Sequence, residues 1–390
     1  MSQSAEVRSS IATPASEADA GSWRGEQGMT DVFVHLARGF DAREWSRRRD
    51  SNQLIGINDP TPYCYGRAEA FHCSIRFSED RPEGPIGRVL RLALRLLLGF
   101  DYLHARRNAA AIRSSQIVWT HTESQFLAVA LLLLLGSRRE QRPKLLGQSV
   151  WLFDRWPSFS RLRRAFYARL IKEVDVLTVH SPDNFAIARA LFPGKWVEIV
   201  RFGIPEHSKV APRLRTGTAA KVLCVGNDGH RDWATAVKAL QNRQDIEVTI
   251  ISGSASPGLV RDASNVRIRR VRENRELLAA MDDATMMLVP LKPNHHASGI
   301  TVIQEAVLRG LPVVATDTGG LRAYFEGDAV HYVPPGDPQA IHKAVLSVMA
   351  DPADAYRRAV LAQSRMGAGG LGGDAFVERH VELTRKLVEG

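Results

Sequence analysis

The sequence has few cysteines and no apolar stretch long enough to cross a bilayer. Its three cysteines, Cys64, Cys73 and Cys224, are far apart, so neither a disulfide framework nor a cysteine metal site is expected. The apolar run 126–135 is about half as long as a membrane span requires and predicts a buried helix instead. We also expect no signal peptide, because the first residues contain no apolar run of that type. These absences favour a globular protein of a reducing cytoplasm.

The length and the charge distribution point to two domains and an anionic partner. A chain of 390 residues is long enough for two separate cores. Residues 1–29 are rich in Ser, Ala, Glu and Gly and predict a disordered tail. The formal net charge is +10, and arginines concentrate in the N-terminal half. Such an excess is typical of proteins that meet nucleic acid or anionic phospholipid.

Residues 86–98 help to choose between these partners. Arg88, Arg91 and Arg95 follow helical spacing and share one face, while leucines cover the rest. This pattern predicts a helix that lies on an anionic bilayer. The alternative is an ordinary packed helix with a solvated basic stripe. A nucleic-acid binder would need basic and aromatic residues interleaved, and the chain lacks that pattern.

Most of the remaining sequence alternates strands with helices. Such alternation predicts parallel, doubly wound sheets covered on both faces, with ligands at the carboxyl ends of the strands. The predicted strands of the first half are 31–36, 115–120, 144–150, 174–179 and 196–200, and those of the second half are 221–225, 246–252, 266–271, 286–290, 312–316 and 330–333. We therefore expect two such domains, residues 30–204 and 220–368, around a central cleft. Residues 205–219 form the expected linker, and residues 369–390 a C-terminal helix that packs back on the first domain.

The segment from Ser298 to Glu305 carries the clearest chemistry. It predicts a small-residue turn followed by a short helix, which Gly310 and Pro312 end. Ser298 and Glu305 then lie on one face, roughly 10 Å apart. A helix N-terminus binds anions, and a carboxylate two turns away can bind a diol, so one diphosphate joined to one ribose would satisfy both. The alternative is an unremarkable helix with an outward Glu.

These features resemble the GT-B glycosyltransferases, and in particular family 4 of retaining enzymes. The most specific part is 298–316, where Ser-Gly-Ile-Thr, Glu-Ala and Gly-Leu-Pro-Val-Val-Ala-Thr match. Shorter similar pieces are Phe202-Gly203-Ile204, Val225-Gly226-Asn227 and Pro335-Gly336-Asp337. The resemblance implies a GT-B fold and a nucleotide-diphosphate sugar as co-substrate, with no cofactor and no metal, consistent with the absence of an Asp-x-Asp motif. The donor-binding residues it implies are Gly226, Asn227, Arg231, Val271, His296, Ser298, Gly299, Ile300, Thr301 and Glu305.

Two positions depart from the family pattern. Ala297 stands where the family has a Glu that contacts the donor sugar, which leaves the donor sugar and retention open. The neighbouring His296 could replace part of that contact, or the two histidines could merely shape the loop. Arg231 stands near the place of the usual Lys, and its planar fork suits a diphosphate. Alternatively, Arg231 forms a salt bridge with Asp232.

The first domain is expected to hold the acceptor. His121 follows a predicted strand at the place where the family has a His facing the donor sugar; a helix cap is the alternative. With Arg231 and Glu305, it is an expected catalytic residue. Candidate acceptor-binding residues are Gly39, Glu123, Gln148 and Asp154. Glu123 could instead favour a helix N-terminus, and core packing explains the nearby tryptophans almost as well.

The sequence thus predicts a hexosyltransferase that acts on a saccharide, lipid-linked or free, in polysaccharide or glycolipid synthesis. We expect it on the cytoplasmic face of the plasma membrane as a peripheral protein. A GT-B-like sugar-nucleotide epimerase is the first alternative, and a non-catalytic nucleic-acid binder is the second.

Overall fold

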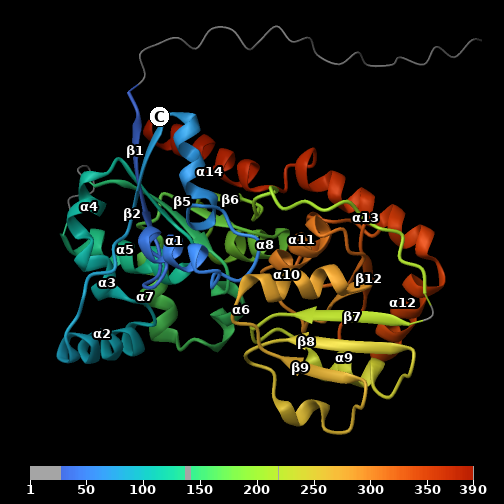
Figure 1. Cartoon of the computed structure of the whole chain (residues 1–390). Coiled ribbons are helices and arrows are strands. Elements are labelled where there is room, and N and C mark those ends of the chain that lie inside the picture. Colours follow the sequence, from blue (N-terminus) through green and yellow to red (C-terminus); the bar gives the residue numbers. More distant parts are fainter. Residues whose placement is uncertain (1–27, 137–141, 218, 390) are drawn as a thin grey trace, which may run out of the picture.

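The computed structural model describes residues 28–136, 142–217 and 219–389. The expected disordered tail, residues 1–29, therefore lies outside the described residues except for its last two. The chain forms two α/β domains, one on each side of Figure 1. Among the described helices, none is both long and apolar enough to cross a membrane.

The first domain contains a six-stranded parallel sheet in the order β2-β1-β3-β4-β5-β6. Its central strands are almost completely buried, because helices cover both faces and leave no solvent side. The strands are β1 (Thr30–His35), β2 (Cys73–Phe77), β3 (Ile117–Thr120), β4 (Lys144–Ser149), β5 (Val176–Val179) and β6 (Val197–Ile199). The helices are α1 (Ala42–Asp50), η1 (Pro62–Phe71), α2 (Pro85–Leu98), α3 (Tyr102–Arg107), α4 (Ala109–Ser114), α5 (Glu123–Gly136), α6 (Leu152–Arg155), η3 (Trp156–Ser158), α7 (Arg161–Ile171) and α8 (Pro182–Leu191).

The second domain also contains a six-stranded parallel sheet, and its strand order is β12-β11-β10-β7-β8-β9. Read from β9, this is the Rossmann order, in which the direction of winding reverses between β7 and β10. The strands are β7 (Ala220–Val225), β8 (Ile246–Ile251), β9 (Val266–Arg269), β10 (Met286–Val289), β11 (Val313–Thr316) and β12 (His331–Val333). The helices are α9 (Trp233–Leu240), η4 (Pro257–Val260), α10 (Asn274–Asp283), α11 (Ile300–Leu308), η5 (Leu321–Ala323), α12 (Pro338–Ala350) and α13 (Pro352–Gly367).

The last helix, α14 (Gly373–Val388), leaves the second domain and packs on the first, at the top of Figure 1. Its buried side chains, Phe376 and Val381 among them, share one core cluster with β1 and β3. Trp119 Nε1 of β3 also donates to Thr384 Oγ1 at 2.9 Å. The first sheet therefore depends on residues from both ends of the chain.

Between the first two predicted strands, at residues 37–114, the structure contains more elements than the sequence pattern predicted. Besides the expected helix at 86–98, it contains α1, η1, β2, α3 and α4. α1 buries only Trp45, so it shows no apolar stripe. β2 is an edge strand with mostly half-buried residues, so it lacks the continuous apolar run by which its neighbours were found.

The orientation of α2 argues against the alternative of a packed helix with a solvated basic stripe that contains Arg91. The Arg91 side chain is buried and forms ion pairs with Glu83 at 2.9 Å and Asp101 at 2.8 Å. Arg91 is the single buried residue of α2, and the apolar side chains of the opposite face are exposed. The helix is thus held by charges on its inner face, and it presents its hydrophobic face outward.

Candidate functional site

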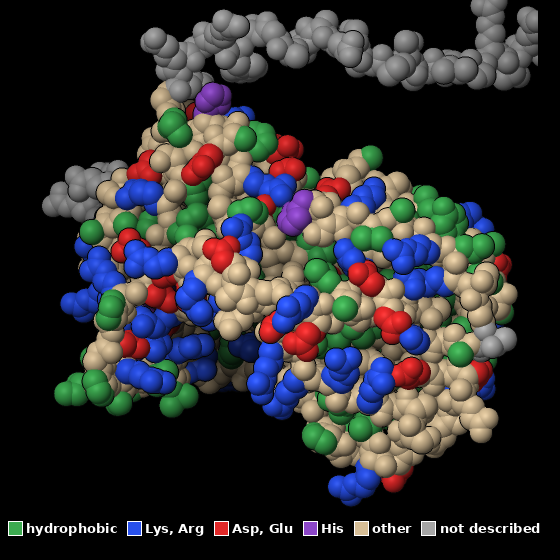
Figure 2. Space-filling model, viewed as in Figure 1, with side chains coloured by type: hydrophobic (Ala, Val, Ile, Leu, Met, Phe, Trp, Pro, Cys, Tyr) green, Lys and Arg blue, Asp and Glu red, His purple; other side chains and the backbone are tan. Residues whose placement is uncertain are grey.

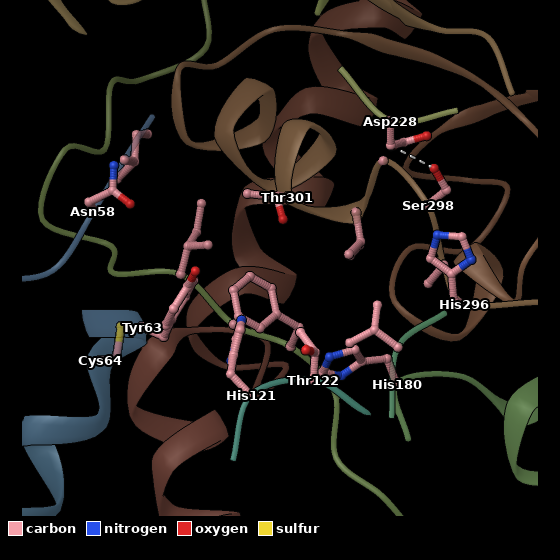
Figure 3. Close-up of a pocket in the computed structure, with 18 of the residues that line it drawn as sticks. Asn58, Tyr63, Cys64, His121, Thr122, His180, Asp228, His296, Ser298 and Thr301 are labelled. Atoms are coloured by element: carbon pink, nitrogen blue, oxygen red, sulfur yellow. Dashed lines mark hydrogen bonds between the residues drawn. The ribbon is translucent and has the colours of Figure 1, made fainter. Parts of the chain in front are cut away.

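A cavity of about 350 Å³ lies between the two domains. Its lining includes the segments that follow β3, β4, β5, β6, β7 and β10, all at the carboxyl ends of parallel strands. Residues between Trp45 and Cys64 of the first domain complete it. Figure 3 shows Ser298 and His296 toward one end of this space, and His121 and Tyr63 toward the other. The site therefore lies at the crevice where doubly wound sheets bind ligands.

The N-terminus of α11 forms one wall of the cavity. Ser298, Gly299, Ile300 and Thr301 all line it, as the sequence predicted for a donor site. Gly299 has a φ of +83° and directs the chain into the helix. Because the first amides of a helix lack partners within the helix, this wall presents hydrogen-bond donors to an anion.

Arg231 lies directly beside this helix start. A methyl group at Gly299 would come within 2.7 Å of Arg231 Nη1, and one at Gly226 within 2.0 Å of Nε. The guanidinium is buried, and within the described part of the chain its Nε and Nη1 have no hydrogen-bond partner. Burial lowers the pKa of Arg231, and nearby Asp228 opposes that shift. A buried, charged fork with free N–H groups is suited to bind an oxyanion.

The alternative to a phosphate role, an ion pair between Arg231 and Asp232, does not form. Asp232 caps α9 by accepting from the backbone N–H of Thr235 at 3.2 Å. The acid near Arg231 is Asp228, whose Oδ2 lies 3.6 Å from Nη2 and accepts from Ser298 Oγ at 3.0 Å. A carboxylate of the chain thus lies between the serine and the arginine.

Glu305 lies outside the cavity wall. Its Oε1 accepts the backbone N–H of Ile57, in the first domain, at 2.9 Å. The same loop makes two hydrogen bonds with Asn274, from Gly56 N to Oδ1 and from Asn274 N to Asn52 O. Burial raises the pKa of Glu305 to about 7, despite the Ile57 hydrogen bond and Arg231. The first domain therefore covers the carboxylate that the sequence assigned to ribose.

His121 lines the cavity at the end of β3. The ring of Tyr63 stacks on it at 3.6 Å between centroids, and Tyr65 Oη lies 3.1 Å from Nδ1. Burial and the neighbouring His180 and His380 hold the pKa of His121 well below its usual value, so the imidazole is neutral. If the Tyr65 hydroxyl donates to Nδ1, Nε2 carries the proton and can donate to a ligand.

The four candidate acceptor-binding residues do not line the cavity. Gly39 donates its N–H to Asp80, and Glu123 accepts the backbone N–H groups of Val150 and Trp151 at 3.1 and 3.2 Å. Gln148 is fully buried and donates to His121 O at 3.1 Å. In this arrangement Glu123 and Gln148 hold the segments that carry Trp151 and His121.

Besides Glu305, three predicted donor residues do not line the cavity. Gly226 follows β7 with a φ of +151° and leaves room for Arg231. Asn227 Oδ1 accepts the N–H of Gly253 at 2.6 Å and so joins the ends of β7 and β8. Val271 packs, half-buried, against the core of the second domain.

His296 lines the cavity and bonds to Asp154, the fourth acceptor candidate. Its Nδ1 lies 2.8 Å from Asp154 Oδ2, and the ring of His230 stands edge-on to it at 4.8 Å. Among the described residues, these three form a group whose possible metal-ligating atoms lie within 4.8 Å of one another. Both oxygens of Asp154 already accept hydrogen bonds, the second from the N–H of His295 at 2.8 Å.

The sequence reading missed Tyr63, His180 and Asp228, which all line the cavity. His180 directly follows β5, just as His121 follows β3, so the rule about strand ends could have found it. Tyr63 has a φ of +52°, and the next residue, Cys64, one of +67°. Ring packing holds this strained turn, and no local sequence signal indicates it.

Comparison with known proteins finds a family model that matches the second domain. Residues 216–351 match the family model described as "Glycosyl transferases group 1". A glycogen synthase of Mycobacterium tuberculosis is 29% identical over 226 residues, which are 54% of this chain and 54% of that protein. The chain thus matches about half the length of the curated relatives.

Solved structures extend the likeness to both domains. A sucrose-phosphate synthase from Thermosynechococcus elongatus superposes with a TM-score of 0.70 at 16% identity, covering 92% of this chain and 99% of that one. HepE from Anabaena, solved with UDP-glucose, has a TM-score of 0.66 at 12% identity and covers 91% and 99%. At these identities the match concerns the fold. The predicted fold class and the predicted resemblance to family 4 glycosyltransferases are thereby confirmed.

Proposed function

Because the chain is a GT-B relative of the group 1 glycosyltransferases, we propose that it transfers a hexosyl group from a nucleotide-diphosphate sugar to a saccharide acceptor. The observation that carries this proposal is the buried Arg231 fork beside the N-terminus of α11. Together they offer positive charge and N–H donors at one point of the interdomain cavity. A diphosphate leaving group needs that combination.

The chemistry follows from where charge develops during transfer. As the bond from sugar to phosphate breaks, negative charge accumulates on the diphosphate, so donors placed there stabilise the transition state more than the ground state. Arg231, Ser298 and the backbone amides of Gly299 and Thr301 are these donors, whereas the Ile300 amide already donates to Ala297 O. Neutral His121 lies at the opposite part of the cavity and can bond a sugar hydroxyl through Nε2.

We assign the binding of ribose to Glu305, which requires the loop 52–58 to move away from this carboxylate. The Ile57 N–H now occupies Glu305 Oε1, in the way a ribose hydroxyl would. We therefore expect the loop 52–58 to release Glu305 when the donor binds. The structural relative solved with UDP-glucose makes UDP-glucose the first donor to examine.

A thermal-shift screen of nucleotide sugars tests the proposal. A donor at a concentration far above its Kd stabilises the folded protein by several kcal/mol, about 2.7 kcal/mol at 100 times Kd. Arg231→Ala and Glu305→Ala should lose this stabilisation, whereas Arg275→Ala, an exposed arginine of the same domain, should retain it. If no nucleotide diphosphate stabilises the protein, the proposal is wrong. If Glu305→Ala keeps the thermal shift while Arg231→Ala loses it, only the assignment of ribose to Glu305 is wrong.

We further propose that the acceptor is lipid-linked and that α2 docks on the inner face of the plasma membrane. Ile86 and Leu96 on α2 are 85% and 84% exposed, as is Leu162 (85%) at the start of α7. The two helices adjoin, since Arg163 donates to Leu97 O at 3.0 Å. In Figure 2, hydrophobic side chains gather at the lower left, where Figure 1 places α2, with Lys and Arg side chains above them. An exposed apolar face rimmed by cations suits an anionic bilayer.

Vesicle co-sedimentation tests the docking surface. The wild type should bind phosphatidylglycerol-containing vesicles and lose binding as salt rises. The double variant Leu96→Glu, Leu97→Glu should bind at least tenfold more weakly, since each buried leucine contributes about 1.5–3 kcal/mol. Leu214→Glu, at an exposed leucine of the linker, is the matched control. Equal binding of all three proteins would exclude α2 as the docking element.

A further inference from the structure

A buried pair of side chains joins the two domains beside the cavity. Asp154 belongs to α6 of the first domain, and His296 to the loop before α11 of the second. His296 Nδ1 and Asp154 Oδ2 are 2.8 Å apart, and the two side chains are 4% and 8% exposed. The pair is therefore shielded from water and fixed from both sides of the cleft.

The surroundings of this pair define its orientation. Asp154 Oδ1 accepts the N–H of His295 at 2.8 Å, so the carboxylate is held in place by the loop that carries its partner. Burial opposes ionisation of Asp154, but the hydrogen bonds from His296 and His295 lower its pKa below the usual value. The ring of Trp151 and the ring of His230 stand edge-on to His296, with centroids at 6.1 and 4.8 Å.

The ionised state of Asp154 determines which ring nitrogen of His296 carries the hydrogen. An ionised carboxylate can only accept hydrogen bonds, so His296 Nδ1 must carry a hydrogen. The second nitrogen, Nε2, remains for another partner, and His296 lines the cavity next to Ser298. A carboxylate behind a histidine fixes both the tautomer and the direction of the ring.

The next residue, Ala297, stands where the resembling family has a glutamate that contacts the donor sugar, and the pair could supply that contact instead. Ala297 has a φ of +54° and is buried, so its methyl group offers no polar atom to a ligand at this point. Asp154 brings a carboxylate to the same loop from the other domain. A histidine directed by a carboxylate can bind a hydroxyl group of a sugar, which both donates and accepts hydrogen bonds.

We propose that His296, positioned by Asp154, reads a hydroxyl group of the donor sugar and so determines which sugar the protein accepts. This inference rests on the proposed function and adds the residues that recognise the sugar half of the donor. His296 is the contacting residue, and Asp154 is a positioning residue rather than an acceptor ligand. Since Asp154 belongs to the first domain, the two domains must be closed for the sugar to be recognised.

The hydrogen bonds favour this reading over a metal site. A cation bound by Asp154, His230 and His296 would compete with the bond from His296 Nδ1, and both Asp154 oxygens are already engaged. Both Asp154 oxygens and His296 Nδ1 thus have hydrogen-bond partners, and Nε2 of His296 is the atom available to a ligand.

Calorimetric titrations with UDP and UDP-glucose, or with ADP and ADP-glucose if the screen selects adenine, test the inference. The measured quantity is the ratio of the two dissociation constants, which reports the contribution of the sugar. We expect His296→Ala and Asp154→Ala to leave the Kd of the nucleoside diphosphate within twofold. The preference for the sugar form should fall about tenfold, the effect of losing one hydrogen bond at a buried polar group. Asp154→Asn, which keeps an acceptor oxygen, should retain more of the preference than Asp154→Ala.

His295→Ala is the matched control, because its side chain is exposed and only its backbone contacts Asp154 and Ser181. It should behave like the wild type. If both ligands weaken equally in the His296 and Asp154 variants, the pair merely shapes the loop and the inference is wrong. It is also wrong if the wild type binds the sugar form no more tightly than the nucleoside diphosphate, or if a chelator abolishes the preference and Zn²⁺ or Mn²⁺ restores it. Failure of the wild type to bind either nucleoside diphosphate would instead contradict the proposed function.

Discussion

At the scale of single residues, polar groups of the protein itself occupy the places where the diphosphate and the ribose of the nucleotide sugar would bind. The Asp228 carboxylate lies between Ser298 and Arg231, and the Ile57 N–H bonds Glu305. Each contact satisfies a polar group that would otherwise be buried without a partner. Donor binding therefore exchanges internal contacts for ligand contacts.

The position of Asp228 leads to a prediction about affinity. A diphosphate beside Ser298 and Arg231 would meet the negative charge of Asp228, so Asp228→Asn should bind UDP about threefold to tenfold more tightly. Roughly 1 kcal/mol is the size expected for a partly exposed charge pair. Isothermal titration calorimetry measures this change, with Asp262→Asn, an exposed position of the same domain, as the control. Weaker binding by the Asp228 variant would mean that this carboxylate is itself a donor ligand.

Glu305 leads to a prediction about pH. Burial raises its pKa in the folded protein to about 7, from about 4.5 for a free glutamate, so between these pH values the folded state holds a proton that the unfolded state has lost. Stability from this group is therefore full below pH 4.5 and falls as the pH rises to 7, by up to about 3 kcal/mol. Glu305→Gln should remove that fall.

Urea unfolding of the wild type and of Glu305→Gln at pH 5 and pH 8 gives the comparison. The variant should gain stability relative to the wild type at the higher pH. Taking the difference between the two proteins cancels the contributions of other groups, including the buried histidines. A constant difference between pH 5 and pH 8 would contradict the assigned shift.

At the scale of elements, the start of α11 depends on a glycine for two reasons. Gly299 has a φ of +83°, which strains any other residue, and an added methyl would lie 2.7 Å from Arg231 Nη1 and 2.8 Å from Val289 Cγ1. Gly299→Ala should lower the free energy of unfolding by about 1–3 kcal/mol and also weaken nucleotide binding.

Gly194→Ala provides the control for backbone strain alone. Its φ is +79°, close to that of Gly299, but an added methyl would meet no atom within 4 Å. In this variant the free energy of unfolding should fall only by the strain of the left-handed backbone, and the nucleotide affinity should not change. If both variants lose the same stability and neither loses affinity, the close packing of Gly299 on Arg231 has no role.

The elements also show which parts of the molecule the sequence could predict. The second domain followed from buried apolar strands and from the Ser-Gly start and Gly-Pro end of α11. β2 and α1 could not be predicted in this way, because an edge strand and a helix with one buried residue leave weak patterns. Ser298 was found because it precedes a predicted helix, and Arg231 because it stands near the place of a lysine in the resembling family. Tyr63, in contrast, lies in a turn that only tertiary packing stabilises.

The burial of Arg91 in α2 could not be predicted from the sequence pattern either. Periodicity placed its arginines on one face, but it could not show which face is buried. Glu83 and Asp101 decide this, because their ion pairs hold Arg91 inside, and both lie outside the helix.

At the scale of the whole molecule, α14 makes the first domain dependent on the last residues of the chain. Phe376 is 1% exposed and packs among the side chains of β1 and β3. Phe376→Ala should reduce the free energy of unfolding by about 3–5 kcal/mol, the usual cost of such a cavity. Glu378→Ala, exposed on the same helix, should change it by less than about 0.5 kcal/mol. Chemical denaturation followed by tryptophan fluorescence measures both, and equal stability of the two variants would show that the α14 contact is dispensable.

The return of α14 also affects how the protein folds during synthesis. The strands of the first sheet are complete at Ile199, but the helix that finishes its core ends at Val388. At 5–20 residues per second, a ribosome needs roughly 10 to 40 s to make the chain between these points. Throughout that interval the apolar side chains of β1 and β3 that α14 will cover are exposed on the nascent chain. The first domain is thus translated before the second but completed after it, and a chaperone that binds apolar surface would find its target there.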